Sequence, residues 1–158
     1  MKRIFLALTI LMTGSTVWAQ QAGQFGAGVI LGDPTGLTVK YWLDGTKAID
    51  AGVGFSGDAT LYTDFLWHSW DILPQPKQGK LGLYVGGGPQ IDTEDSTEFG
   101  IRAIGGIDYW IANHPIELFL EGGPAFMLTT ENDEDREIDF NAGLGVRFYF
   151  GVTGGGKK

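Results

Sequence analysis

Charged residues stand at intervals inside otherwise apolar stretches of this sequence, and they could form ion pairs in a shared interior. Lys40, Arg102 and Arg147 are the basic members of the set. Charges that face one interior need partners, because an unpaired buried charge costs on the order of several kcal/mol. We predict an internal charge network in which Lys40 pairs with Asp50 across the turn at residues 44–45. The predicted members are Lys40, Asp50, Asp64, Arg102, Asp108, Glu117, Glu121, Asp139 and Arg147.

Histidine and serine could instead form a hydrolytic site, which needs a serine activated by a histidine that a carboxylate orients. The chain has two histidines, His68 and His114. His68 precedes Ser69, but adjacent residues of a strand point to opposite faces. His114 precedes Pro115 in an expected turn. We therefore expect no catalytic residue and no enzyme activity, and a lipid hydrolase embedded in a membrane is the alternative.

The acidic segment 131–135 raises the question of a metal site. It lacks the glycine and the ligand spacing of a calcium-binding loop. Blocks of like charge are ordinarily solvated. We expect neither a metal site nor a cofactor.

The elements that would position the charged residues are strands whose two faces differ in chemistry. In segment 138–150 every second residue is apolar, from Ile138 to Phe150, while Asp139 and Arg147 fall on the opposite face. The same alternation recurs upstream, and no apolar face carries a charge. The other expected strands are 24–31, 37–43, 48–55, 59–68, 80–88, 98–110 and 116–128.

The first nineteen residues indicate export. Lys2 and Arg3 precede an apolar run and a small-residue end at Ala19, as in a secretory signal peptide. We expect a signal peptide at 1–19, one β domain at 20–150 and a flexible Gly/Lys tail at 151–158. There is no cysteine, and beyond residue 19 no apolar run of about 18 residues could form a spanning helix. The net charge of −8 disfavours nucleic acid as a partner.

Aromatic residues suggest which face points outward. They cluster at the C-terminal ends of the even-numbered strands, which share one rim in an up-and-down barrel, and aromatic rings favour membrane interfaces. We predict an aromatic girdle and an all-β fold, an eight-stranded antiparallel up-and-down transmembrane β-barrel. The alternative is a soluble periplasmic lipid-binding barrel with the apolar face inside. The girdle would comprise Tyr41, Trp42, Trp67, Trp70, Tyr109, Trp110, Phe148 and Phe150.

With eight alternating segments and the final residues 146–150, the chain resembles the small OmpA/OmpX-like outer-membrane barrels. More narrowly, segments 32–37, 40–43, 48–50 and 115–121 resemble compact barrels of largely unassigned function. The resemblance covers about residues 24–150. It implies an outer-membrane location, contact with outer-membrane lipid and lipopolysaccharide, and insertion by the barrel-assembly machinery. The linker 69–79 is longer than the short periplasmic turn that this topology implies.

The resemblance leaves the role open, and no external partner can be named. An eight-stranded barrel is just wide enough for side chains to fill it. We therefore expect a structural or interaction role with a filled or narrowly hydrated lumen. The predicted network contains six acids and three bases, and this excess of negative charge favours an alternative function, a small cation-preferring pore.

Overall fold

The computed structural model describes residues 22–55, 59–93, 97–128 and 138–150. The expected signal peptide and C-terminal tail lie outside these residues, as does the acidic segment 131–135. Within the described ranges, no helix is long and apolar enough to cross a membrane. The strands are β1 (Phe25–Asp33), β2 (Gly36–Trp42), β3 (Lys47–Gly54), β4 (Ala59–Ser69), β5 (Lys80–Thr93), β6 (Thr97–Trp110), β7 (Ile116–Met127) and β8 (Ile138–Phe150).

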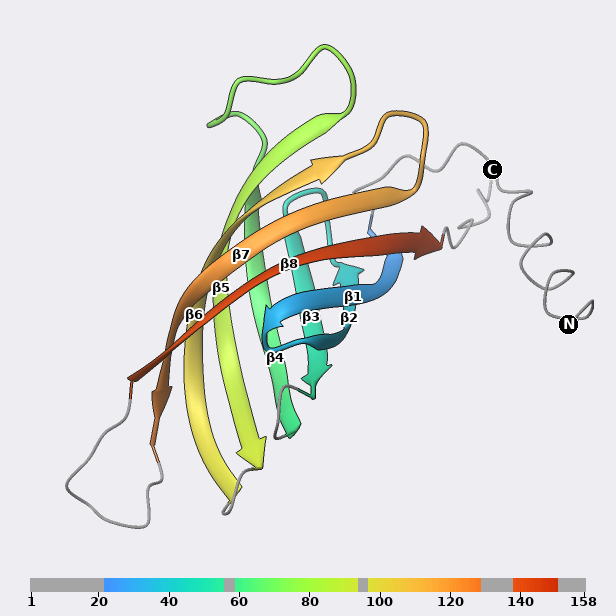
Figure 1. Ribbon diagram of the computed structural model, residues 1–158. Helices are drawn as coiled ribbons and strands as arrows, with labels where there is room; N and C mark the ends of the chain where they lie inside the picture. The colour runs from blue at the N-terminus through green and yellow to red at the C-terminus, as the bar shows by residue number, and fades with distance from the viewer. Residues whose placement is uncertain (1–21, 56–58, 94–96, 129–137, 151–158) are drawn as a thin grey trace, which may run out of the picture.

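Each strand pairs antiparallel with its neighbours in sequence, and β1 pairs with β8 to close the barrel (Figure 1). Phe25 lies opposite Phe150, so the first strand begins and the last strand ends at the same end of the barrel. We call this the terminal end. The connections 43–46, 70–79 and 111–115 also lie there, because each joins an even-numbered strand to the next one. The predicted eight-stranded antiparallel barrel is confirmed.

One strand differs clearly from its predicted bounds. β5 continues to Thr93, five residues beyond the predicted end at Gly88. The sequence Gly-Gly-Gly-Pro at 86–89 is typical of a turn, yet these residues pair with β6 on one side. The other seven strands begin and end within two residues of the predicted positions.

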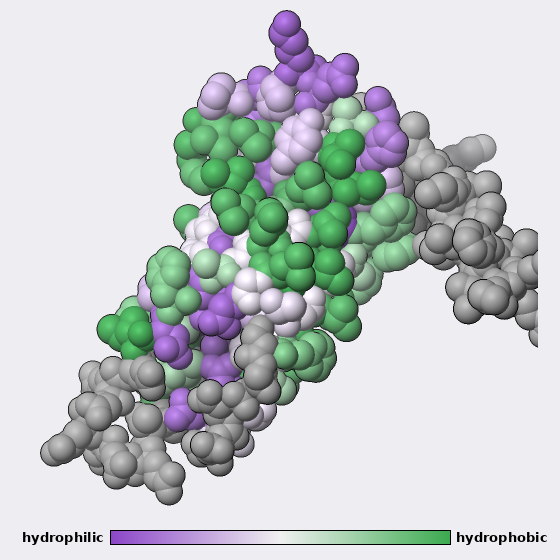
Figure 2. Space-filling view, in the orientation of Figure 1, coloured by the Kyte–Doolittle hydropathy of each residue, from purple (hydrophilic) through white to green (hydrophobic). Residues whose placement is uncertain are grey.

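The apolar faces of the strands point outward. Among the described residues, twenty-five large hydrophobic side chains, most of them on strands, are at least 37% exposed, with Phe140 at 69%. Figure 2 shows such side chains across the middle of the face in view, with hydrophilic ones toward its upper end. A water-soluble barrel would hide this surface. The predicted orientation, with apolar residues outside and charged residues inside, is confirmed.

Two prolines interrupt the ladders in a similar way. Pro89 in β5 and Pro124 in β7 lack the N–H that a ladder requires, and the pairing with the preceding strand skips both positions. Gly88 and Gly123 come directly before them. A Cβ at either glycine would lie 1.9 Å from a carbonyl oxygen of the neighbouring strand. Glycine is therefore required for the two strands to approach this closely.

The turn at 43–46 is fixed by one carboxylate. Asp44 accepts hydrogen bonds from the backbone N–H groups of Thr46 and Lys47, both at 2.7 Å, and from the Thr46 hydroxyl at 3.0 Å. The hydrogen bond from the Thr46 backbone is the largest cause that lowers the pKa of Asp44, to about 2. This turn holds β2 and β3 in the register that places Lys40 opposite Asp50.

Candidate functional site

The lumen contains the charged residues that the strands turn inward. Of the nine predicted members of the charge network, eight are buried, with at most 5% of each residue exposed. The three cations lie in three layers, and each one contacts two carboxylates and the face of at least one aromatic ring. The buried members are Lys40, Asp50, Asp64, Arg102, Asp108, Glu117, Glu121 and Arg147.

The middle layer is built around Arg147 of β8. Its guanidinium pairs with Asp50 and, at 3.2 Å, with Glu117, and it donates to the Thr38 hydroxyl at 2.9 Å. Its Cζ lies 3.8 Å from the centroid of the Phe119 ring. A buried guanidinium is stable in such a setting, because its planar fork is matched by acceptors and its face by a ring.

Lys40 of β2 forms the layer nearer the terminal end. Its Nζ donates to Glu117 at 2.6 Å and lies 3.7 Å from Asp108. It is also 2.9 Å from Nε2 of His68 and 4.8 Å from the centroid of the Trp42 ring. Because an ammonium group has no lone pair, Nε2 of His68 must be the acceptor, and the ring proton then sits on Nδ1.

The predicted ion pair between Lys40 and Asp50 is wrong. The two residues are directly opposite in the β2–β3 ladder, as expected. Lys40, however, has a long flexible side chain that reaches the carboxylate of Glu117 on β7. Asp50 has a short side chain, and Arg147 reaches it from β8. In a narrow barrel, strands that are not adjacent can supply the closest partner.

Arg102 of β6 forms the third layer. Its guanidinium contacts Asp64 through Nε at 3.1 Å and through Nη2 at 3.0 Å, and Glu121 through Nη2 at 3.2 Å. Its Cζ lies 4.0 Å from the centroid of the Tyr62 ring. The Tyr84 hydroxyl donates to Glu121 at 2.7 Å and so fixes the second oxygen of that carboxylate.

The buried layers hold five carboxylates and three cations. Each of the five lies within 3.7 Å of a cation, and Glu117 is shared by Lys40 and Arg147. Beside Arg102, Glu121 and Asn141 there is an empty volume of about 170 Å³, but none of it is wide enough for a water molecule. The described part of the lumen is therefore densely packed at this level.

Asp139, the ninth predicted member, is exposed. It is the second residue of β8, and the residue opposite it is Ala125 near the end of β7. The prediction that Asp139 belongs to the internal network was wrong. Strand alternation determines whether a side chain faces inward or outward, but not how far along the barrel axis it lies. A residue near a strand end can share the inner face and still lie beyond the packed layers.

The predicted girdle divides into two groups. Tyr41, Trp67 and Phe150 are outside and at least 40% exposed, and Tyr109 and Phe148 are partly exposed.

Three girdle predictions were wrong. Trp42 and Trp110 are buried in the lumen. Their neighbours Tyr41 and Tyr109 already face outward, and successive strand residues cannot share a face. Trp70 follows the last residue of β4, where alternation no longer applies.

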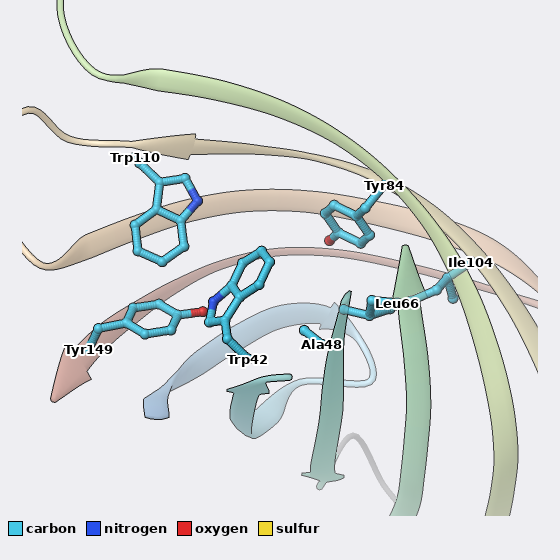
Figure 3. Close-up of a cluster of buried hydrophobic side chains, with 7 residues drawn as sticks. All are labelled: Trp42, Ala48, Leu66, Tyr84, Ile104, Trp110 and Tyr149. Carbon is cyan, nitrogen blue, oxygen red and sulfur yellow. The ribbon is translucent and has the colours of Figure 1, made fainter. Parts of the chain in front are cut away.

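The buried tryptophans form an aromatic layer at the terminal end of the lumen. Figure 3 shows Trp42 with the rings of Trp110 and Tyr149 close by. The centroids of Trp42 and Trp110 are 6.1 Å apart, and those of Trp110 and Tyr149 are 4.5 Å apart. Trp70 packs against this cluster. Sequence reasoning missed Trp42, Trp110 and Thr38 as lumen residues, although their positions on the inner faces of β2 and β6 could have revealed them.

The histidines lie in different surroundings. His68 is buried, with Nε2 near Lys40 and 3.7 Å from Asp108. Ser69 lies opposite the outward-facing Leu83. His114 is exposed, with Nδ1 2.9 Å from a backbone oxygen in its own turn. Among the described residues, no group of three or more His, Asp or Glu could hold a metal ion.

Comparisons with known proteins give one structural match. No protein-family model and no curated protein matches the sequence. A solved structure, the N-terminal β-barrel domain of Pseudomonas aeruginosa OprF, matches with a TM-score of 0.51 and 20% identity. The match covers 83% of this chain and 100% of the OprF domain chain. This chain therefore has the closed eight-stranded, antiparallel barrel fold of that domain.

Proposed function

We propose that the chain is an integral barrel of the bacterial outer membrane, with a structural or interaction role and a lumen closed by packed side chains. The observation that carries the proposal is the inverted distribution of side chains. Large apolar residues cover the outside, and eight charged residues are buried inside. Burying one such apolar side chain is worth about 1.5–3 kcal/mol. In a membrane, lipid hydrocarbon would surround the whole outer face and remove the cost of exposing these side chains to water.

The fold likeness to the OprF barrel domain supports the same location. The packed lumen supports a role that does not require solute flow, because ion pairs and rings fill its three layers. Outer-membrane lipid and lipopolysaccharide would then contact the apolar surface, and the barrel-assembly machinery would insert the chain. The interaction partner would dock at the barrel ends, which carry the connections between strands.

A pair of arginine substitutions tests the membrane location. Leu120→Arg puts a charge on the outer face of β7, whereas Ile72→Arg puts one on the connection 70–79; both native residues are exposed. In a bilayer, Leu120→Arg is expected to cost about 2–4 kcal/mol near the midplane, and Ile72→Arg close to nothing. The measurement is folded yield in lipid vesicles, read as the band that shifts on boiling in SDS.

The native chain serves as the control in the same gel assay. Native protein from purified outer membranes should show a heat-modifiable band that resists extraction by urea. Release of the native chain with the soluble periplasmic fraction would contradict the proposal. Equal behaviour of the two arginine variants would do so as well, since both positions would then face water.

A small cation-preferring path is a second candidate, favoured by the two carboxylates in excess of cations in the buried layers. If the lumen stays packed, we expect no single-channel current steps when the refolded chain is added to a planar bilayer. Steps with a reversal potential that favours K⁺ over Cl⁻ would support the second candidate. Heat-modifiable protein without any steps would leave the closed barrel as the proposed function.

A further inference from the structure

The connection 70–79 is built as an ordered element at the terminal end of the barrel. Connections between antiparallel neighbours usually have 2–5 residues, and this one is longer. Gln75 holds it together: its amide nitrogen donates to the carbonyl oxygens of Trp70 and Leu81, both at 2.7 Å. Its amide oxygen accepts from the Leu81 backbone N–H at 3.0 Å. These bonds fix the two ends of the connection.

The connection places Trp70 over the lumen. The Trp70 ring stacks on the ring of His68 at 5.8 Å between centroids and lies 6.0 Å from the ring of Trp42. Two contacts hold it from outside. Its Nε1 donates to the carbonyl oxygen of Gly45 at 2.9 Å, and Lys80 Nζ lies 3.9 Å from the ring centroid. Trp70 is only partly buried, so solvent reaches its other side.

Under Trp70 lie buried polar atoms with no hydrogen-bond partner among the described residues. They are Nδ1 of His68 and Oδ1 of Asp108. The Trp70 ring lies beside Oδ1 of Asp108, next to Gly82. A Cβ at Gly82 would be 2.1 Å from Asp108 Oδ1 and 2.6 Å from the Trp70 ring. Buried polar groups are nearly always hydrogen bonded, and where protein supplies no partner, water usually does.

We propose that Trp70 is a lid over a water-binding vestibule formed by His68 and Asp108. With the lid open, water-sized molecules from the terminal end reach the Nδ1–H donor of His68 and the free carboxylate oxygen of Asp108. The layers around Lys40 and Arg147 lie below and keep the rest of the lumen closed. This inference goes beyond the proposed function and holds for the folded barrel in detergent as well as in a membrane.

Histidine modification measures the opening directly. Hydroxyl radicals, which are close to water in size, oxidise histidine rings that solvent reaches, and exposed His114 provides an internal reference in the same molecule. The readout is the ratio of the modification rates of His68 and His114, measured by peptide mass spectrometry on the refolded full chain. We expect Trp70→Ala to raise this ratio at least tenfold. Trp67→Ala, which removes an outward-facing tryptophan, should leave it unchanged.

A second variant opens the lid without removing it. In Gly82→Ala the added methyl group would lie 2.1 Å from Asp108 Oδ1 and 2.6 Å from the Trp70 ring. Both groups must shift, so the ring covers the vestibule less completely and we expect the ratio to rise here too, by at least threefold. Folding of each variant is verified by its heat-modifiable band. An unchanged ratio in folded Trp70→Ala would overturn the lid. If that variant gives no folded protein, an unchanged ratio in Gly82→Ala would overturn it instead.

The experiment separates the lid from the membrane proposal. The ratio is measured in detergent micelles and again in vesicles, and the lid predicts the same increase in both. A chain that proves to be soluble would contradict the membrane location and leave the labelling result intact. A folded membrane barrel with unchanged labelling would contradict the lid alone.

Discussion

Replacing Arg147 by methionine is expected to lower the free energy of unfolding by about 3–5 kcal/mol, the usual cost of breaking a buried ion pair from one side. Arg147 is fully buried and contacts the carboxylates of Asp50 and Glu117. Glu117 keeps Lys40, but within the described part of the chain Asp50 retains only the Thr38 hydroxyl as a hydrogen-bond donor. The measurement is equilibrium unfolding by urea in lipid vesicles, followed by tryptophan fluorescence and by the heat-modifiable band.

Two variants test the reason for this loss. Adding Asp50→Asn to Arg147→Met removes the uncompensated charge and should recover part of the stability. Lys47→Met breaks the ion pair with Asp44 at the surface, where both side chains are more than 40% exposed. That change should cost far less, because water screens an exposed ion pair. If Arg147→Met costs no more than Lys47→Met, the buried network does not stabilise the barrel.

Replacing Gly123 by alanine is expected to destabilise the barrel by about 3 kcal/mol, the upper part of the usual range for an overpacked interior. The added methyl carbon would lie 1.9 Å from the carbonyl oxygen of Ala103. That atom belongs to the backbone of β6 and cannot rotate away. β6 and β7 must therefore separate beside Pro124, where the ladder already lacks pairs. Urea unfolding in vesicles gives the size of the loss.

Gly105→Ala is the matched control for this change. Gly105 lies in β6 and pairs with Gly122, next to Gly123. A Cβ at Gly105 would have its nearest neighbour at 3.9 Å, so the methyl group fits. We expect the unfolding midpoint of Gly105→Ala to stay close to that of the native chain. Equal losses of stability in the two variants would show that the cost comes from the reduced flexibility of the alanine backbone and not from the close approach of the two strands.

Strand alternation made most of the barrel predictable, because the outward-facing side chains are apolar and most charged side chains face inward. Lys40, Arg102 and Arg147 could be assigned to one face from the sequence alone. The same rule, applied strictly, would also have placed Trp42 and Trp110 inside, since each follows an outward-facing tyrosine. Residue type alone therefore predicted the wrong side of the barrel for these two tryptophans.

The pairing inside the lumen could not be read from the sequence. Which carboxylate Lys40 meets depends on how strands on opposite walls are staggered, and the pattern of one strand carries no information on that. The position of Trp70 was unpredictable for another reason. It depends on hydrogen bonds made by Gln75 in the connection, and connections have no periodic signal.

The charge network has a consequence for the order in which the chain assembles. Arg147 meets residues 97 and 109 positions earlier in the chain, and Lys40 meets one 77 positions later. Contacts between such distant parts of a chain form late and slowly. An open sheet that lacked β8 would leave Asp50 without its guanidinium, although Arg102 of β6 could still meet Asp64 of β4 and Glu121 of β7. The ion pairs of Arg147 therefore form only when β8 joins the sheet, and they stabilise the last step, in which β8 meets β1.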